Sequence, residues 1–453
     1  MKKEINMIEG RIFPQMMRFS LPIMLSSALQ TLYNAADSVI VGRSDAANAL
    51  GAVGSAGPII NIILNLFMGL SVGANVIIAR YRGAGDEENV KRTTDTAFVV
   101  ALVSGILTAI LGIAIAKPLA QLVKIDPDII DMTVLYMQIY FAGLPFIAIY
   151  NFMSSTLRGI GNTQGPMLCL IVSGAINVIF NIIFVMFCGM DVDGVALATV
   201  ISQLIAAVMI VVMVKRSTIG LSLKNIHFDR KIFKNTVRIG VPAGIQGMVF
   251  AISNTIIISS INSFGPEAAS ANTIAGQVDS ILYVIINSVT QAVITFTSQN
   301  IGARKPERIN AVLKNGLLIA VVSGILLAAI SYVAKDFIIE CFAPGNDVVK
   351  EFAVIKFQYV VLPYFAVALM EIPTGMLRGM NATFIAMVMT VLGICGLRIL
   401  WLLFIFPMFG TLQSLYVSYP ISWIGTAVVN FIAYIYLKKK LDRDILMGKD
   451  FMA

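Results

Sequence analysis

A polar stripe crosses an otherwise apolar segment near the start of the chain, and its residue types suit the binding of a proton or a cation. The segment runs from about Phe19 to Val41, and its polar members recur at steps of three and four: Ser26, Gln30, Tyr33, Asn34 and Asp37. On a helix, this spacing puts them on one face. A carboxylate within a membrane span is costly and usually faces a cavity or a partner, so Asp37 is the first candidate for a functional group. The alternative is that Asp37 lies among the headgroups or makes a structural pair.

The overall composition sets the class of protein. Of the 453 residues, 58% are hydrophobic and 13% are charged, and the mean hydropathy is +0.85. Soluble domains carry about 25% charged residues, so these values predict an all-α, polytopic membrane protein. No cleavable apolar segment of signal-peptide length follows the opening Met-Lys-Lys-Glu, so the first span is expected to remain in the mature protein. The four cysteines lie far apart and predict neither disulfides nor a metal site.

Twelve segments are apolar over the roughly 20 residues that a bilayer requires. Their expected limits are 14–41, 50–79, 93–116, 131–154, 165–188, 194–214, 236–262, 268–298, 309–333, 351–374, 382–407 and 411–437. A long polar connector divides them into two groups of six. The sequence therefore predicts four parts: an N-terminal lobe (1–214), a cytoplasmic linker (215–235), a C-terminal lobe (236–437) and a cytoplasmic tail (438–453).

The distribution of basic residues indicates the orientation in the membrane. The net charge is +8, and 26 of the 33 Lys and Arg residues fall on the side of the expected spans that holds both termini. Cytoplasmic loops carry such an excess, so we expect a multi-pass protein of the cell membrane with both termini in the cytoplasm. The basic central linker is then a solvated stretch beside anionic headgroups, and no nucleic-acid partner is expected. His227, the single histidine, lies there and is expected to be inert.

The two halves of the sequence repeat each other at an offset of about 220 residues. Three of the repeated blocks are Arg18-Phe-Ser-Leu-Pro22 with Arg238-Ile-Gly-Val-Pro242, Ser104-Gly-Ile with Ser323-Gly-Ile, and Leu157-Arg-Gly with Leu377-Arg-Gly. An even number of spans gives both halves the same orientation, so an axis along the membrane normal should relate them. Two such lobes with a site between them predict alternating access.

Four blocks carry a resemblance to a known family: Asn34-Ala-Ala-Asp37 followed by Val41-Gly42, Gly83-Ala-Gly-Asp86, Leu157-Arg-Gly-Ile-Gly-Asn-Thr163, and Asn177 four residues before Asn181. Together they resemble the multidrug and toxic compound extrusion (MATE) family, over essentially the whole chain. The resemblance implies a secondary antiporter that exports cationic, amphipathic compounds in exchange for protons or sodium ions. No cofactor is expected besides the coupling ion.

The resemblance also implies a coupling-ion site in the N-terminal lobe. Carried onto this sequence, its residues are Asp37, Asn177, Asn181 and Thr199, with Asn34 beside Asp37 on the stripe. Sodium prefers hard oxygen ligands, and these four side chains can supply them. Prokaryotic members of the family often have a second aspartate in place of Asn181, and its absence here favours protons slightly. Alternatively, the amides and the hydroxyl only join helices by hydrogen bonds.

The second half keeps part of the polar stripe. Asn254 aligns with Asn34, whereas Ile257 aligns with Asp37. The second half instead has Glu371, Arg398 and Asp279 within its expected spans. Glu371 and Arg398 are predicted to neutralise each other, either at a functional face or as a structural pair, and Asp279 has an alternative place near the headgroups. The expected substrate cavity combines residues of both halves: Gln30, Tyr33, Asn254, Asp279, Glu371 and Arg398.

Other function classes fit the sequence less well. A lipid-linked oligosaccharide flippase of a related superfamily must hold a pyrophosphate with several cationic groups, and only Arg398 is expected within the spans. An enzyme needs a nucleophile or metal constellation, which a single loop histidine does not supply. Aromatic and apolar side chains with one or two carboxylates favour small organic cations as substrates. We therefore expect no enzyme but a transporter, embedded in the lipid bilayer and functional as a monomer.

Overall fold

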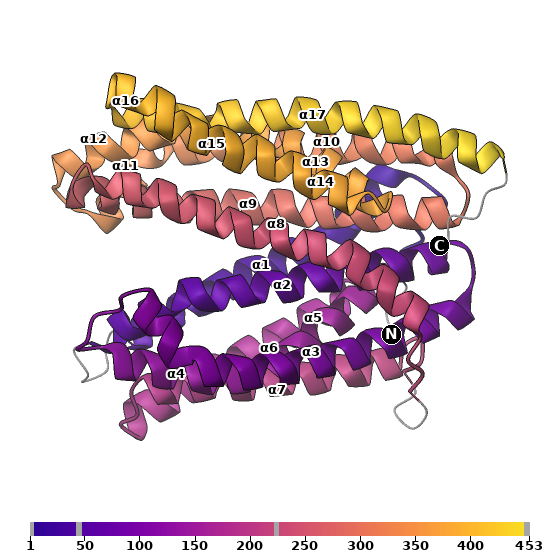
Figure 1. Cartoon of the computed structure of the whole chain (residues 1–453), viewed down its shortest axis with the longest axis horizontal. Coiled ribbons are helices and arrows are strands. Elements are labelled where there is room, and N and C mark those ends of the chain that lie inside the picture. The colour runs from indigo at the N-terminus through magenta and orange to yellow at the C-terminus, as the bar shows by residue number, and fades with distance from the viewer. Residues whose placement is uncertain (1–3, 42–47, 222–225, 448–453) are drawn as a thin grey trace. The chain divides into compact units, whose positions relative to one another are not determined.

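Helices make up most of the described chain in the computed structural model (Figure 1). The structure describes residues 4–41, 48–221 and 226–447, and within these ranges it leaves out the side chains of residues 34–39, 41, 50 and 446. No β-strand occurs in these three ranges. The predicted all-α membrane fold is therefore confirmed.

The chain divides into two compact units. The first unit holds Leu25–Gly244 with the start of the chain up to Ile5, and the second holds Asn6–Met24 with Ile245–Ala453. Two long helices contribute to both units. They are α1 (Ile12–Val41) and α8 (Arg230–Asn262).

The first unit contains six further α-helices and a π-helical segment. These are α2 (Ala49–Gly83), α3 (Glu87–Leu122), α4 (Ile130–Ala142), α5 (Leu144–Gly159), α6 (Gln164–Asn181), η1 (Ile182–Phe187) and α7 (Val192–Lys215). Helix α5 packs against α2, α3 and α7, and α6 packs against α7. The pair α6 and α7 carries the polar residues Ser173, Asn177, Asn181, Thr199, Ser202 and Gln203.

The second unit is interrupted more often by π-helical turns. Its elements after α8 are α9 (Pro266–Gly302), α10 (Pro306–Val333), α11 (Lys335–Phe342), α12 (Asp347–Lys356), η2 (Phe357–Val361), η3 (Leu362–Tyr364), α13 (Phe365–Gly379), α14 (Thr383–Thr390), η4 (Val391–Gly396), α15 (Leu397–Leu400), η5 (Trp401–Ile405), α16 (Phe406–Phe409) and α17 (Leu412–Leu446). Helix α13 packs against α9, α10 and α17.

The units differ from the expected lobes at α1 and α8. The first half of α8 belongs to the first unit because glycines let it approach α2: a Cβ on Gly69 would lie 2.1 Å from the Gly244 nitrogen, and one on Gly240 would lie 2.6 Å from the Leu70 Cα. Small residues allow such close helix packing in membranes. The start of α1 belongs to the second unit, where the Phe19 and Phe296 rings meet edge to face with centroids 5.9 Å apart.

The lengths and hydropathy of the helices fit a membrane protein. Within the described residues, 10 helices are long and apolar enough to cross a membrane, or 11 if α4 and α5, bent by 47°, form one span. Every one of the twelve expected spans coincides with a helix or a run of helices, including α1 for the first. The boundaries shift, since α8 already begins inside the expected linker and α17 continues into the expected tail.

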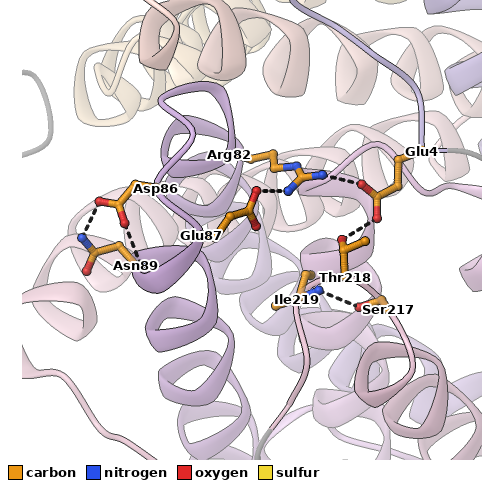
Figure 2. A network of polar contacts seen from close by, with 8 residues as sticks. All are labelled: Glu4, Arg82, Asp86, Glu87, Asn89, Ser217, Thr218 and Ile219. Carbon is orange, nitrogen blue, oxygen red and sulfur yellow. Dashed lines mark hydrogen bonds and ion pairs between the residues drawn. The ribbon is translucent and has the colours of Figure 1, made fainter.

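A tight turn explains the Gly83-Ala-Gly-Asp86 block. Helix α2 ends at Gly83, Gly85 has a left-handed φ of +74°, and the Asp86 side chain caps α3 by accepting a hydrogen bond of 3.0 Å from the Asn89 N–H. Beside this turn, Arg82 makes ion pairs with Glu87 and, at 2.6 Å, with Glu4 (Figure 2). The block therefore shapes the α2–α3 connection.

Candidate functional site

A small polar cavity lies within the first unit, where α1, α6 and α7 meet. Its volume is about 60 Å³. The lining residues are Gln30, Tyr33, Leu170, Ser173, Gly174, Asn177, Thr199, Ser202 and Gln203. Two members of the α1 stripe therefore face the polar stripes of the two helices that carry the expected coupling residues.

Tyr33 closes one side of this cavity against a glycine. Its hydroxyl donates a 3.3 Å hydrogen bond to the Ile171 carbonyl oxygen, and its ring lies over Gly174. A Cβ on residue 174 would fall 1.9 Å from a ring carbon. Only glycine permits this approach, so residue 174 fixes how closely α1 meets α6.

A directed chain of hydrogen bonds joins the expected coupling residues of α6 and α7. The Asn181 Nδ2 donates to Asn177 Oδ1 over 3.3 Å, and the Asn177 Nδ2 donates to Thr199 Oγ1 over 3.5 Å. The Thr199 hydroxyl then donates to the Val195 carbonyl oxygen over 3.0 Å. Asn177 and Asn181 are buried, and the structure brings them together with Thr199. The spacing of four residues predicted that the two asparagines share a face.

The side chains of Asp37 and Asn34 lie outside the described residues. The backbone of α1 does include both positions, and Asp37 follows Tyr33 by four residues on this helix. One helical turn rises about 5.4 Å, so the Asp37 Cα lies one turn beyond the Tyr33 Cα on the same face. The backbone of α1 therefore carries position 37 one turn beyond Tyr33, which lines the cavity.

The size of the cavity limits what it can hold. One water needs about 10–15 Å³ of space for its centre, so a cavity with about 60 Å³ of such space has room for a few waters or a small ion. It is too small for a drug-sized molecule, which needs about 300 Å³ or more. Gln203 adds an enclosed Oε1 with no hydrogen-bond partner among the described residues. The cavity thus suits proton or ion exchange.

In the second unit, Arg398 is buried among neutral groups. Its Nε donates to Ser422 Oγ over 3.0 Å and its Nη1 to Asn254 Oδ1 over 3.4 Å. The guanidinium carbon lies 4.0 Å from the centroid of the Tyr419 ring and 5.8 Å from that of Trp423. Asn254 therefore contacts Arg398, which the sequence did not predict.

The predicted pair of Glu371 and Arg398 is wrong. Within the described residues Arg398 makes no ion pair, because its guanidinium is turned toward α8 and α17. Glu371 is 2% exposed and interacts electrostatically with Arg378, two turns along the same helix. Arg378 also donates to Gln246 Oε1 over 2.9 Å.

Sequence reasoning missed the partner of Asp279. Lys356 is 5% exposed, and its Nζ lies 2.9 Å from Asp279 Oδ2 and donates to the Asn272 carbonyl oxygen over 3.1 Å. The Tyr364 hydroxyl donates to the Asp279 backbone carbonyl. Arg398 is therefore not the only cation within the spans. The signal was available, since Lys356 falls inside the expected span 351–374.

The long apolar helices and the buried polar groups define a polytopic helical membrane protein. A family model, MatE, matches residues 22–183 and again residues 242–404, which together cover most of the chain. The chain belongs to this family of multidrug and toxic compound extrusion (MATE) transporters. The two matched segments coincide with the sequence repeat, and the expected resemblance is confirmed.

Relatives and solved structures agree with this assignment. The chain is 26% identical over 345 residues to the Probable multidrug resistance protein YoeA of Bacillus subtilis, covering 74% of each chain. It is 23% identical over 346 residues to the Multidrug export protein MepA of Staphylococcus haemolyticus, covering 75% of this chain and 76% of the other. A solved structure of a multidrug resistance MATE family transporter in an outward-facing conformation matches the fold with a TM-score of 0.90, 22% identity and coverage of 98% of this chain and 99% of the other.

Proposed function

We propose that this chain is a secondary antiporter that exports cationic, amphipathic compounds and couples their export to ion entry at Asp37. The observation that carries the proposal is the small polar cavity of the first unit, which continues the α1 stripe toward Asp37. An acid on a membrane helix is retained where it faces a cavity. The names of the relatives YoeA and MepA, which describe multidrug resistance and export, support the substrate class.

Protons are the coupling ion that the described contacts favour. Asn177 and Thr199 use their side-chain oxygens within the chain of hydrogen bonds, so a sodium ion would have to displace or share these bonds. A proton needs only the carboxylate. Desolvation of a carboxylate within a span favours its protonated form.

Drug and proton bind alternately in this mechanism. Protonation of Asp37 from outside removes the negative charge that attracts the organic cation, and the cation is released there. After the transporter turns inward, loss of the proton restores the negative charge that attracts the next organic cation. Alternation requires only that each ligand has different affinities for the two states. Both termini lie in the cytoplasm in this scheme, as the excess of basic residues on their side indicates.

The test is dye efflux from proteoliposomes under a proton gradient alone and under a sodium gradient alone. We expect the proton gradient to drive export of a cationic dye by the wild type, and Asp37→Asn to fold but lose this coupled export. Asp347→Asn, which removes an exposed carboxylate at the start of α12, is the matched control and should export normally. Undiminished gradient-driven export by Asp37→Asn would contradict the role of Asp37. Transport of lipid-linked oligosaccharides but not of cationic dyes would favour the flippase instead.

A further inference from the structure

Arg398 stands out in the second unit as a buried charge without a counter-charge in contact. It is 4% exposed and lies in the middle part of the apolar run Thr383–Phe409. A charged arginine within a span costs several kcal/mol unless its surroundings compensate. Each group described in hydrogen-bond or ring contact with it is neutral: Ser422, Asn254, Tyr419 and Trp423.

No acid of the described residues lies within ion-pair distance of Arg398. Asp279 is paired with Lys356 at 2.9 Å, and Glu371 makes no ion pair in residues 4–41, 48–221 or 226–447. The positive charge of Arg398 therefore has no ion-pair partner among these residues.

The guanidinium is held in a way that leaves donors for a ligand. Its two described hydrogen bonds use Nε and Nη1, while the Tyr419 ring covers one face at 4.0 Å. Nη2 has two N–H groups, and no hydrogen bond to them is described in residues 4–41, 48–221 or 226–447. Nη1 has a second N–H besides the one donated to Asn254, so Nη1 and Nη2 of the stacked guanidinium can offer a carboxylate one parallel pair of hydrogen bonds.

The backbone around Arg398 is irregular in the same place. Arg398 lies in the single α-helical turn α15, between the π-helical segments η4 and η5. Such wide turns are rare in proteins overall, but those that occur often lie at functional sites. They change the direction of side chains that an unbroken α-helix would point elsewhere. Here they accompany a guanidinium directed at α8 and α17.

The sequence repeat supplies an independent argument. Asn254 and Ser422, which hold Arg398, lie 220 residues after Asn34 and Ser202 of the first unit. Ser202 lines the polar cavity there, and Asn34 belongs to the stripe of Asp37. The same two polar positions therefore occur with an acidic residue, Asp37, in the first half of the sequence and with a basic residue, Arg398, in the second half.

We propose that the Arg398 cluster, defined as Arg398, Asn254, Ser422, Tyr419 and Trp423, is a binding site for a small monovalent anion. The ligand is either the carboxylate of an organic solute, such as a zwitterionic substrate, or a free halide. The anion accepts hydrogen bonds from Nη2 and supplies the missing negative charge. The site lies wholly within the second unit, and its occupancy is independent of coupling at Asp37.

The chain contains its own reporter for this binding. It has two tryptophans, Trp401 and Trp423, and the second lies 5.8 Å from the guanidinium. In purified Trp401→Phe protein, the fluorescence of Trp423 is titrated with benzoate, with benzamide as its neutral isostere, and with bromide. We expect the fluorescence response to benzoate to saturate, with an apparent dissociation constant about tenfold or more lower than that of any response to benzamide. Saturation by bromide alone would identify a halide as the ligand.

Three variants in the same background separate binding from general quenching. Arg398→Gln should abolish saturation, and Arg398→Lys should weaken benzoate more than bromide because an ammonium lacks the fork. Arg443→Gln, which removes an exposed cation from the end of α17, should bind as the parent does. The proposal is overturned if neither benzoate nor bromide saturates, or if Arg398→Gln keeps the saturation of the parent. A second outcome needs only the Trp401→Phe parent protein. If its fluorescence responds equally to benzoate and benzamide and does not saturate with bromide, the proposal is also overturned.

Discussion

Tyr33 packs directly over Gly174, so closely that a Cβ on residue 174 would fall 1.9 Å from a carbon of the tyrosine ring. Gly174→Ala must therefore displace the ring from its place beside the cavity. Overpacking of this kind costs about 1–3 kcal/mol, so we expect a lower melting temperature and a loss of gradient-driven export. Gly57→Ala is the control, since a Cβ at residue 57 of α2 meets no atom within 4 Å. Equal melting temperatures and export rates for the two variants would contradict this account.

The hydrogen-bond chain makes a separate prediction for Thr199. Thr199→Val keeps the shape of the side chain but removes the acceptor of the Asn177 amide and the donor to the Val195 carbonyl. Leaving a buried polar group unpaired costs about 1–3 kcal/mol, which corresponds to a loss of about 5- to 150-fold if the cost falls on the transport-competent state. Dye export by proteoliposomes measures this loss. Thr199→Ser retains the hydroxyl and should export nearly as well as the wild type, and equal defects in both variants would exclude the chain of hydrogen bonds as the cause.

Asp336 should make stability depend on pH outside the membrane. Hydrogen bonds from Lys335 and Lys350 lower the pKa of this exposed carboxyl below its ordinary value. Because the folded pKa lies below the unfolded value of about 3.9, the stabilisation is complete above that pH and is lost as the pH falls through the folded pKa. The melting temperature of the wild type should therefore exceed that of Asp336→Asn by a small margin at pH 6, and the margin should shrink progressively as the pH falls below about 3.9. A difference that stays constant over this range would refute the ion pairs.

The helical spacing of polar residues in the sequence was enough to predict much of the polar cavity in the first unit. The steps of three and four that place Gln30 and Tyr33 on one face of α1, and Asn177 and Asn181 on one face of α6, predicted which sides of the helices are polar. The close approach of Tyr33 to Gly174 could not be predicted, because contacts between helices far apart in sequence depend on how the helices pack.

The second site shows where periodicity fails. A π-helical turn holds extra residues, so counting in α-helical steps across η4 loses the rotational phase by up to about 100° per inserted residue. The predicted pairing of Arg398 with Glu371 rested only on their opposite charges within expected spans, and the observed contacts of Arg398 with Asn254 and Ser422 lie elsewhere. Lys356 was missed for a different reason. The count of basic residues assigned it to a loop exposed to solvent, whereas it lies within helix α12.

The pair of Asp279 and Lys356 gives the sharpest prediction for stability. Both side chains are largely buried, at 21% and 6% exposure, with 2.9 Å between Oδ2 and Nζ. Removing one partner leaves an uncompensated buried charge, which costs about 3–5 kcal/mol, whereas replacing both can be nearly neutral. Asp279→Asn and Lys356→Met should each lower the melting temperature in detergent strongly, and the double variant should recover most of the loss. The coupling energy from the double-mutant cycle measures the interaction. Additive losses, with the double variant less stable than either single one, would show that the pair does not stabilise the second unit.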